Sequence, residues 1–201
     1  MSLIESIHRK HRSGSKFLIR PCNDIVVEMQ LIRCTKKLQK RLSLSNDEFM
    51  KHESSGDILG PWHANLIAIS GSPAILFAND RTLLNFFIDI NPHGPVHHFH
   101  KNFVAMVSCL LADLGVRDAT REYLIQEYTE IGFAPTNNRR VLGSMNDLAF
   151  HYDCLVSEAG GIHSADVPRI IRDLNGMPMS MLPEGAPDRE LKQMVAELRT
   201  L

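Results

Sequence analysis

The sequence lacks the long apolar run that a membrane-spanning helix or a secretory signal needs. No stretch approaches the roughly 18 apolar residues of a membrane span, and the first residues contain no apolar core like that of a signal peptide. These absences argue against a membrane partner. We therefore expect a cytoplasmic protein.

Closely spaced cysteines, which zinc cages and disulfide frameworks require, are also missing. The four cysteines are far apart in the sequence: Cys22, Cys34, Cys109 and Cys154. This spacing fits a reducing cytosol. Cys34 stands just before an expected helix start at Thr35, where a helix dipole favours a thiolate, but a buried structural cysteine is the simpler interpretation.

An excess of charge of one sign is absent as well. Lys and Arg total 22 against 23 for Asp and Glu, so there is no global electrostatic reason to expect a nucleic-acid partner, although a local basic patch remains open. The 44% hydrophobic and 22% charged content is typical of a soluble globular protein, and 201 residues favour a single domain. Repeats and low-complexity tracts are absent.

The common catalytic and cofactor motifs are missing too: there is no G-x-S-x-G, P-loop or G-x-G-x-x-G. We therefore expect no cofactor, and whether the protein is an enzyme stays open. The histidines are densest at His93, His97, His98 and His100. Neighbouring positions at one helix start do not all converge on one point, and no carboxylate or H-E-x-x-H accompanies them. We expect no metal site.

What is present predicts an α+β fold. Residues 1–24 form a basic arm without an apolar pattern, either a simple tail or a contact for an acidic surface. Residues 25–201 then form one domain, with 162–201 as a helical extension. Strand patterns occupy 25–34, 62–69, 74–78, 82–90 and about 130–134. Helix patterns occupy 36–42, 99–114, 118–128, 145–159, a short segment ending at 175, and 188–201.

The short turns between the middle strands predict an antiparallel meander in a sheet of four to five strands. We expect the helices at 99–114 and 145–159 to cover one face of this sheet. Within the strand that opens at 62, alternation places Trp62 and Ala64 on one face and His63 and Asn65 on the other. We interpret Trp62 as a buried anchor.

The polar stretch 136–147 is the most informative part of the sequence. Ser144 is a good N-cap and Asp147 follows three residues later, which predicts a helix start at Met145. Asn137, Asn138, Arg139 and Arg140 precede it. Their donors, beside helix-terminal N–H groups, suit a phosphate or carboxylate. A solvated turn is an equally good interpretation.

Four segments carry a resemblance to a family of short bacterial proteins known only as a domain of unknown function. They are 31–38 (LIRCTKKL), 59–66 (LGPWHANL), 76–80 (LFAND) and 138–146 (NRRVLGSMN), with a weaker N-x-M-P-M element at 175–179. Such proteins typically have a C-T-K-K-L start, an L-G-x-W-[HY]-A motif and an N-R-S-V-x-G-S-x-N block. Arg140 replaces the usual serine of that block, which weakens any role for a hydroxyl there. The resemblance implies no activity.

Three functional hypotheses follow. The first is a small binding module for an anionic ligand, a nucleotide or nucleic acid, with a site formed by Arg33, Lys36, Trp62, His63, Asn65, Asn138, Arg139 and Asn146. The second is a hydrolase or nuclease in which His63 is the general acid or base and Arg139 stabilises charge. The third is a structural protein that binds a partner. The sequence does not determine the oligomeric state.

Overall fold

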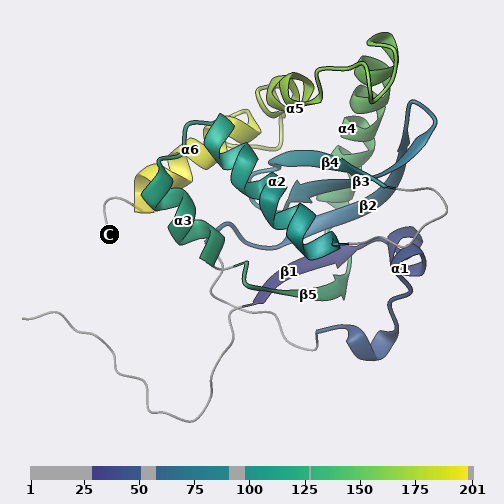
Figure 1. Ribbon diagram of the computed structural model, residues 1–201. Helices are drawn as coiled ribbons and strands as arrows, with labels where there is room; N and C mark the ends of the chain where they lie inside the picture. Colours follow the sequence, from purple (N-terminus) through teal and green to yellow (C-terminus); the bar gives the residue numbers. More distant parts are fainter. Residues whose placement is uncertain (1–28, 51–57, 91–97, 127, 199–201) are drawn as a thin grey trace, which may run out of the picture.

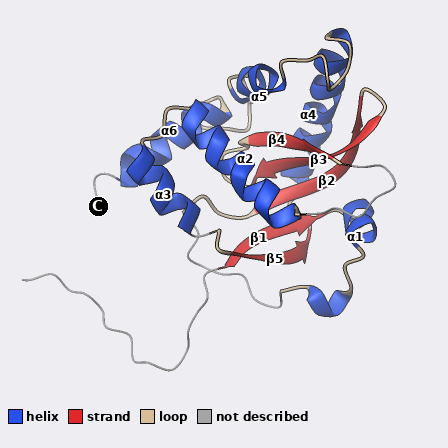
Figure 2. Ribbon diagram, in the orientation of Figure 1, coloured by secondary structure: helices blue, strands red, loops and turns tan. Residues whose placement is uncertain are grey.

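A five-stranded mixed sheet with helices on both sides forms the centre of the molecule (Figures 1 and 2). The computed structural model describes residues 29–50, 58–90, 98–126 and 128–198. The strands lie in the order β4-β3-β2-β1-β5. Their bounds are β1 Met29–Cys34, β2 Trp62–Ile69, β3 Ser72–Asn79, β4 Asn85–Asp89 and β5 Glu130–Pro135.

The helices follow the predicted order. Their bounds are α1 Lys36–Leu42, α2 Phe99–Asp113, α3 Asp118–Gln126, α4 Arg139–Glu158, α5 Val167–Asn175 and α6 Pro187–Leu198, with a 3-10 turn, η1, at Asn46–Glu48. None of the helices in the described ranges is long and apolar enough to cross a membrane. The predicted basic arm, residues 1–24, lies outside the described residues.

The sheet is antiparallel in only one half. Strands β2, β3 and β4 form the predicted antiparallel meander, but β1 pairs in parallel with both β2 and β5. The prediction of a purely antiparallel sheet is therefore wrong. Parallel pairs need long crossover connections, about a dozen residues or more. The connection from β1 to β2 contains α1 and η1, and the connection that carries the chain from β4 across the sheet to β5, beside β1, contains α2 and α3.

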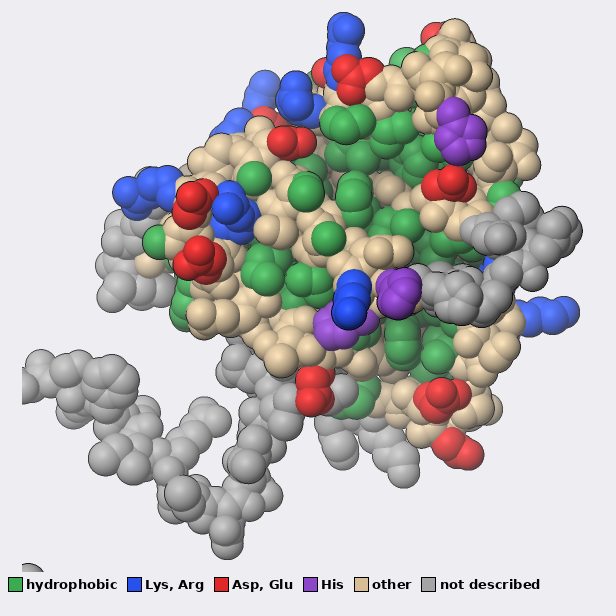
Figure 3. All heavy atoms as spheres, in the orientation of Figure 1, with side chains coloured by type: hydrophobic (Ala, Val, Ile, Leu, Met, Phe, Trp, Pro, Cys, Tyr) green, Lys and Arg blue, Asp and Glu red, His purple; other side chains and the backbone are tan. Residues whose placement is uncertain are grey.

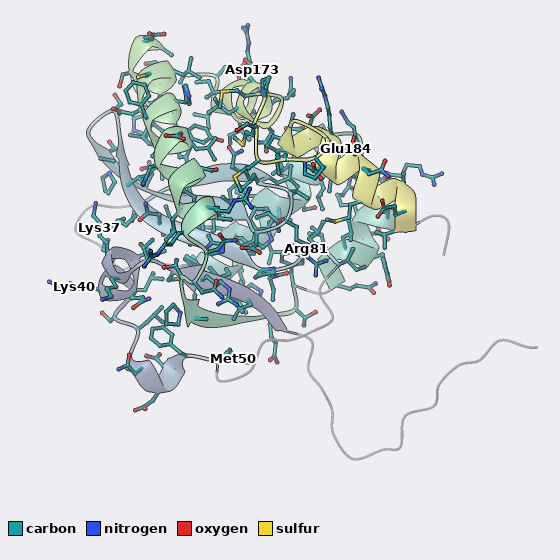
Figure 4. All side chains as sticks on the ribbon, turned by 180° about the vertical axis from the view of Figure 1, so that it is seen from behind. Lys37, Lys40, Met50, Arg81, Asp173 and Glu184 are labelled. Atoms are coloured by element: carbon teal, nitrogen blue, oxygen red, sulfur yellow. The ribbon has the colours of Figure 1, made fainter. Side chains whose placement is uncertain are left out.

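The two long helices lie on opposite faces of the sheet, so the expectation that they share one face is also wrong. In the view of Figure 1, α2 lies in front of the strands and α4 lies behind them. In Figure 4, which is seen from behind, α4 lies in front of the sheet. The central strand β3 explains why both faces are covered: residues 74–79 are all buried. A strand that is buried on both sides needs a layer on each side.

The face under α2 is aromatic. Trp62 is fully buried there, and its ring lies 5.6 Å from Phe86 and 5.5 Å from Phe103. Phe77 stacks on Phe86 at 5.0 Å. The indole Nε1 of Trp62 donates a 2.9 Å hydrogen bond to the hydroxyl of Tyr128. This environment confirms the interpretation of Trp62 as a core anchor.

Helix α4 begins earlier than the sequence predicts. Its N-cap is Asn138, whose side chain accepts from the backbone of Arg140 and Val141. The buried stripe consequently starts one turn earlier, with Val141 ahead of Met145. Ser144 is therefore not a cap: it lies inside the helix, and its hydroxyl contacts the sulfur of Met181 at 2.9 Å. Two adequate capping residues compete in this stretch, and the earlier one allows an extra buried turn.

The start of α1 matches its prediction. Thr35 is the N-cap, and its hydroxyl accepts from the backbone N–H of Leu38. Cys34, immediately before it, is completely buried. Burial raises the pKa of the Cys34 thiol from 9.0 to about 12, so the side chain stays a neutral thiol at physiological pH. The structure therefore agrees with a structural cysteine.

Candidate functional site

Two polar side chains lie side by side on the face of the sheet that α4 covers. Arg33 of β1 and His63 of β2 are partners in the parallel register, so both point to the same face. His63 has no exposed surface and Arg33 is 6% exposed. The ring Nε2 of His63 lies 2.8 Å from Oδ1 of Asp80, directly after β3. Strands β1 and β2 and the turn after β3 thus contribute one polar group each.

Asn138 connects this group to the start of α4. Its amide nitrogen donates a 3.0 Å hydrogen bond to Oδ1 of Asp80. Its amide oxygen accepts from the backbone N–H groups of Arg140 at 3.1 Å and Val141 at 3.4 Å. One side chain therefore both caps the helix and fixes the position of its N-terminus over Asp80.

These contacts make Asp80 a stable anion. The hydrogen bond to His63 is the main influence that holds the pKa of the Asp80 carboxyl below its usual value, with the bond from Asn138 and the charges of His63 and Arg33 acting in the same direction. Partial burial opposes them. The carboxylate is consequently ionised at neutral pH, and its charge is already engaged by neighbouring groups.

The turn after β3 is held by the segment that precedes β2. The amide nitrogen of Asn79 donates to the carbonyl oxygen of Leu59 at 3.0 Å, and the N–H of Asp80 donates to that of Pro61 at 2.9 Å. The side-chain oxygen of Asn79 accepts from the backbone of Arg81 and Thr82. These bonds give Asp80 and Arg81 fixed positions.

Gly60 explains how Arg81 fits beside that segment. Its φ of +76° lies in the left-handed region, and a Cβ built there would approach Nε of Arg81 to 2.7 Å. Only glycine has neither the conformational penalty nor the clash. Arg81 donates from Nη1 to the carbonyl oxygen of Ile58 at 2.8 Å. The guanidinium therefore lies across the glycine.

A polar pocket of about 600 Å³ opens at this place. Its seven lining residues are Arg33, Pro61, Asp80, Arg81, Asn137, Asn138 and Arg139. Three arginines thus line the pocket together with one acidic residue, Asp80. The N-terminus of α4 lies at its rim, because Asn138 and Arg139 belong both to the pocket and to the helix start.

The structure brings together only part of the predicted ligand site. Arg33, Asn138 and Arg139 line the pocket, and His63 lies beneath it in contact with Asp80. Trp62 does not join them, because it points to the opposite face.

Three further predicted residues also lie outside the pocket lining. Asn65 is partly buried and accepts from the Thr35 hydroxyl at 2.9 Å. Lys36 is exposed at the start of α1, and Asn146 is exposed two turns into α4. The neighbouring Lys37 and Lys40 project outward from α1, whereas Arg81 lies over the body of the molecule (Figure 4). The α1 lysines are therefore not part of the pocket.

The predicted set of site residues omitted Pro61, Asp80, Arg81 and Asn137. Asp80 is the important omission, since it connects His63 with Asn138. The sequence contains a signal for it: Asp80 lies two residues after Ala78, the register partner of His63, and thus on the same face of the sheet. That signal is readable only when the register is known.

The histidine group is only partly described, since His93 and His97 lie outside the described residues. His98 is exposed at the start of α2. The ring Nε2 of His100 lies 2.8 Å from the carbonyl oxygen of Tyr128. Within the described ranges, no three His, Cys, Asp or Glu side chains are grouped so that they could hold a metal ion.

Comparison with protein families gives one match. The model of a family described as Domain of unknown function (DUF6933) matches residues 31–190. The chain belongs to this family. The matched region runs from β1 into α6 and contains every residue that lines the polar pocket. A comparison with curated proteins found no match. The family description gives no activity.

Proposed function

We propose that the protein is a binding module for a small anionic molecule, whose phosphate or carboxylate group is held in the polar pocket. The observation that carries this proposal is the balance of charge: Arg33, Arg81 and Arg139 line the pocket with Asp80 as the one carboxylate. That carboxylate already accepts hydrogen bonds from neighbouring side chains. An anionic ligand would add a second negative charge to a lining that contains three arginines.

Burial strengthens this argument for Arg33. Its guanidinium, with only 6% of the residue exposed, lies where the effective dielectric constant is lower than in water, so its attraction for an anion is stronger. The planar guanidinium also matches the geometry of phosphate and carboxylate oxygens, to which it binds through two parallel hydrogen bonds. The pocket therefore favours a ligand with a planar or tetrahedral oxyanion.

The start of α4 adds a second attraction. The helix is 20 residues long and has no acidic residue in its first turn, where Arg139 and Arg140 oppose the helix dipole. Among the described residues, the Arg139 N–H has no hydrogen-bond partner, whereas the next two N–H groups are capped by Asn138. A bound anion would accept from this N–H and offset the positive end of the helix.

The lining also limits the size and type of ligand. A volume of about 600 Å³ is within the usual range for small-molecule sites. No aromatic side chain is among the described residues that line it, so the pocket offers no platform on which a base could stack. The features favour recognition of the anionic group itself and favour a small ligand over nucleic acid.

Calorimetric titration with pyrophosphate at low salt tests the proposal, and adjacent arginines provide a matched pair. Arg139 lines the pocket and Arg140 does not. The loss of one charge-assisted hydrogen bond costs about 1.5–3 kcal/mol of binding free energy, which corresponds to a roughly tenfold or greater increase in Kd. We expect that loss for Arg139→Gln and a much smaller change for Arg140→Gln. No saturable heat with the wild type, or equal weakening in both variants, contradicts the proposal.

A second candidate is a hydrolase, favoured by the 2.8 Å contact between His63 and Asp80. His63 is completely buried, so Asp80, with 28% of its side chain exposed, would have to reach the substrate. Its lowered pKa makes it a weak general base. Hydrolysis of 4-nitrophenyl phosphate by the wild type that disappears in Asp80→Asn would support the hydrolase. Pyrophosphate binding without turnover supports the binding module alone.

A further inference from the structure

We infer that the outer edge of β4 binds an extended peptide from a partner protein, one with apolar residues at its centre and basic residues at its ends. This site is separate from the polar pocket. The peptide would add to the sheet as a new strand beside β4, with its apolar side chains in a groove between α2 and α5. The direction of the β4 backbone groups, the lining of the groove and its charge support this proposal.

The hydrogen-bonding pattern of β4 leaves alternate residues facing outward. Ile90 donates to the carbonyl oxygen of Pro73, and the carbonyl oxygen of Leu84 accepts from Asn79. In an antiparallel pair, residues that bond across to the partner alternate with residues whose N–H and C=O point away from it. Asn85, Phe87 and Asp89, between those bonded positions, therefore direct their backbone groups toward the free edge.

At Asn85, a side chain of the same protein already pairs with this edge. The side-chain amide of Asn175, at the end of α5, accepts from the N–H of Asn85 at 2.9 Å and donates to its C=O at 2.7 Å. An amide that forms both bonds reproduces the pairing of an added strand. The pairing does not continue along the strand: among the described residues, the outward backbone groups of Phe87 and Asp89 have no hydrogen-bond partner.

An apolar groove of about 470 Å³ lies directly beside those two residues. Phe87, Ile88 and Asp89 form its wall on the strand side. The other walls come mainly from apolar residues of α2, of α5 and of the segment before α5: Met106, Leu110, Ile162, Val167 and Ile171. A broad patch of hydrophobic side chains is visible on this face, between α2 and α5 (Figure 3). Side chains alternating from an added strand would reach both walls.

The charge of the groove defines the ends of the peptide. Asp89 and Asp113 are its charged lining residues, no Lys or Arg lines it, and neither carboxylate forms a salt bridge within the described part of the chain. Both are exposed. Basic residues on either side of an apolar centre therefore complement the groove.

The opposite edge of the sheet shows what a covered edge looks like. There Phe49 forms a parallel bridge with Phe133 of β5, and the N–H of Met50 donates to the carbonyl oxygen of Phe133 at 2.8 Å. Proteins commonly cover exposed strand edges in this way, because a free edge pairs with other chains. Among the described residues, the edge of β4 is covered in the same sense only at Asn85.

The test uses the full chain and a fluorescent peptide, Lys-Val-Ile-Val-Val-Lys with blocked ends, followed by polarisation at low salt. A second peptide carries N-methyl groups on its two central amides, which removes backbone donors and keeps the side chains. We expect saturable binding of the first peptide and at least tenfold weaker binding of the second. Equal binding of both, or no saturable binding of the first, overturns the strand-addition proposal.

Two exposed alanines of α2 locate the binding. Ala105 lines the groove and Ala112 does not. We expect Ala105→Arg to weaken peptide binding at least tenfold and Ala112→Arg to leave it within about twofold. Equal effects of the two substitutions would overturn the assignment to this groove. Because both positions are exposed, melting curves of the two variants should match the wild type, which separates loss of binding from loss of folding.

Discussion

The two faces of the sheet differ sharply at one place, where consecutive residues of β2 point in opposite directions. Trp62 enters an aromatic layer beneath α2, and its one polar atom is bonded to Tyr128. His63 enters a charged group beneath the start of α4, between Arg33 and Asp80. Apolar burial stabilises a fold, whereas buried charge is costly unless it is paired. The first face therefore accounts for stability, and the second is the better candidate for function.

Each face also contains one buried polar atom without a partner among the described residues. The ring Nδ1 of His63 is buried and has no hydrogen-bond partner in the described structure. Most buried polar atoms in proteins have partners, and exceptions require an explanation. On the aromatic side, the indole nitrogen of Trp62 has a partner, but Oε1 of Gln30, two residues before Ile32 on β1, has none within the described residues. The comparison predicts that substitutions on the α2 face change mainly stability, while substitutions around the pocket change mainly ligand binding and its dependence on pH.

The largest expected effect is that of Trp62→Ala. Emptying the site of a completely buried tryptophan costs roughly 3–5 kcal/mol. Denaturant unfolding followed by circular dichroism measures the loss, because this substitution removes the only tryptophan fluorescence. Trp62→Phe is the control: it keeps an aromatic ring and removes the bond to Tyr128, so its loss should be smaller. A cost below about 1 kcal/mol for Trp62→Ala would place the side chain outside the core.

A smaller loss of stability is expected for Asn175→Ala. Asn175 lies beside Asn85, the first residue of β4. Asn175 is fully buried and bonds both backbone groups of Asn85. Its removal leaves these groups without partners, at a cost of about 1–3 kcal/mol. The exposed Asn146 of α4 provides the comparison, since Asn146→Ala should stay within about 0.5 kcal/mol of the wild type. Equal unfolding midpoints for the two variants would contradict the role of Asn175.

The smallest effect on stability is expected for Asp80→Asn, in how the free energy of unfolding depends on pH. This effect is also the most specific to the polar face. The pKa of Asp80 is lower when folded than in the unfolded chain, where it is about 3.9. The unfolded state therefore binds the proton first as pH falls. Asp80 contributes its full stabilisation above that value and loses it as the pH falls through the lower folded pKa. The stability difference between wild type and Asp80→Asn should shrink below about pH 4; a difference that stays constant down to acid unfolding would contradict this account.

Local patterns predicted much of this fold because the relevant interactions are local. Thr35 was identifiable as a cap, the β2–β4 meander follows from short turns, and alternation alone assigned Trp62 and His63 to different faces. The parallel pairing of β1 with β2 and β5 depends on long crossovers. No local pattern specifies which strands such crossovers bring together.

The site was only partly predictable for the same reason. Arg33, Asn138 and Arg139 were identifiable from their charge and hydrogen-bonding capacity near an expected helix start, and all three line the pocket. Asp80 depends on the register between β2 and β3, which the sequence does not state. The helix start at Arg139 depends on whether Asn138 or Ser144 is the cap, and the packing of Val141 against the sheet decides between them.

The most direct test of the central claim, that the polar pocket binds an anion, is the melting temperature of wild type and Arg139→Gln with and without pyrophosphate at low salt. Stabilisation by a ligand follows its affinity for the folded state. We expect both proteins to melt at similar temperatures without ligand, and only the wild type to gain stability when pyrophosphate is added. A wild type that pyrophosphate does not stabilise, beside an Arg139→Gln variant that melts well below it, would mean that Arg139 holds the fold together and would contradict the binding account.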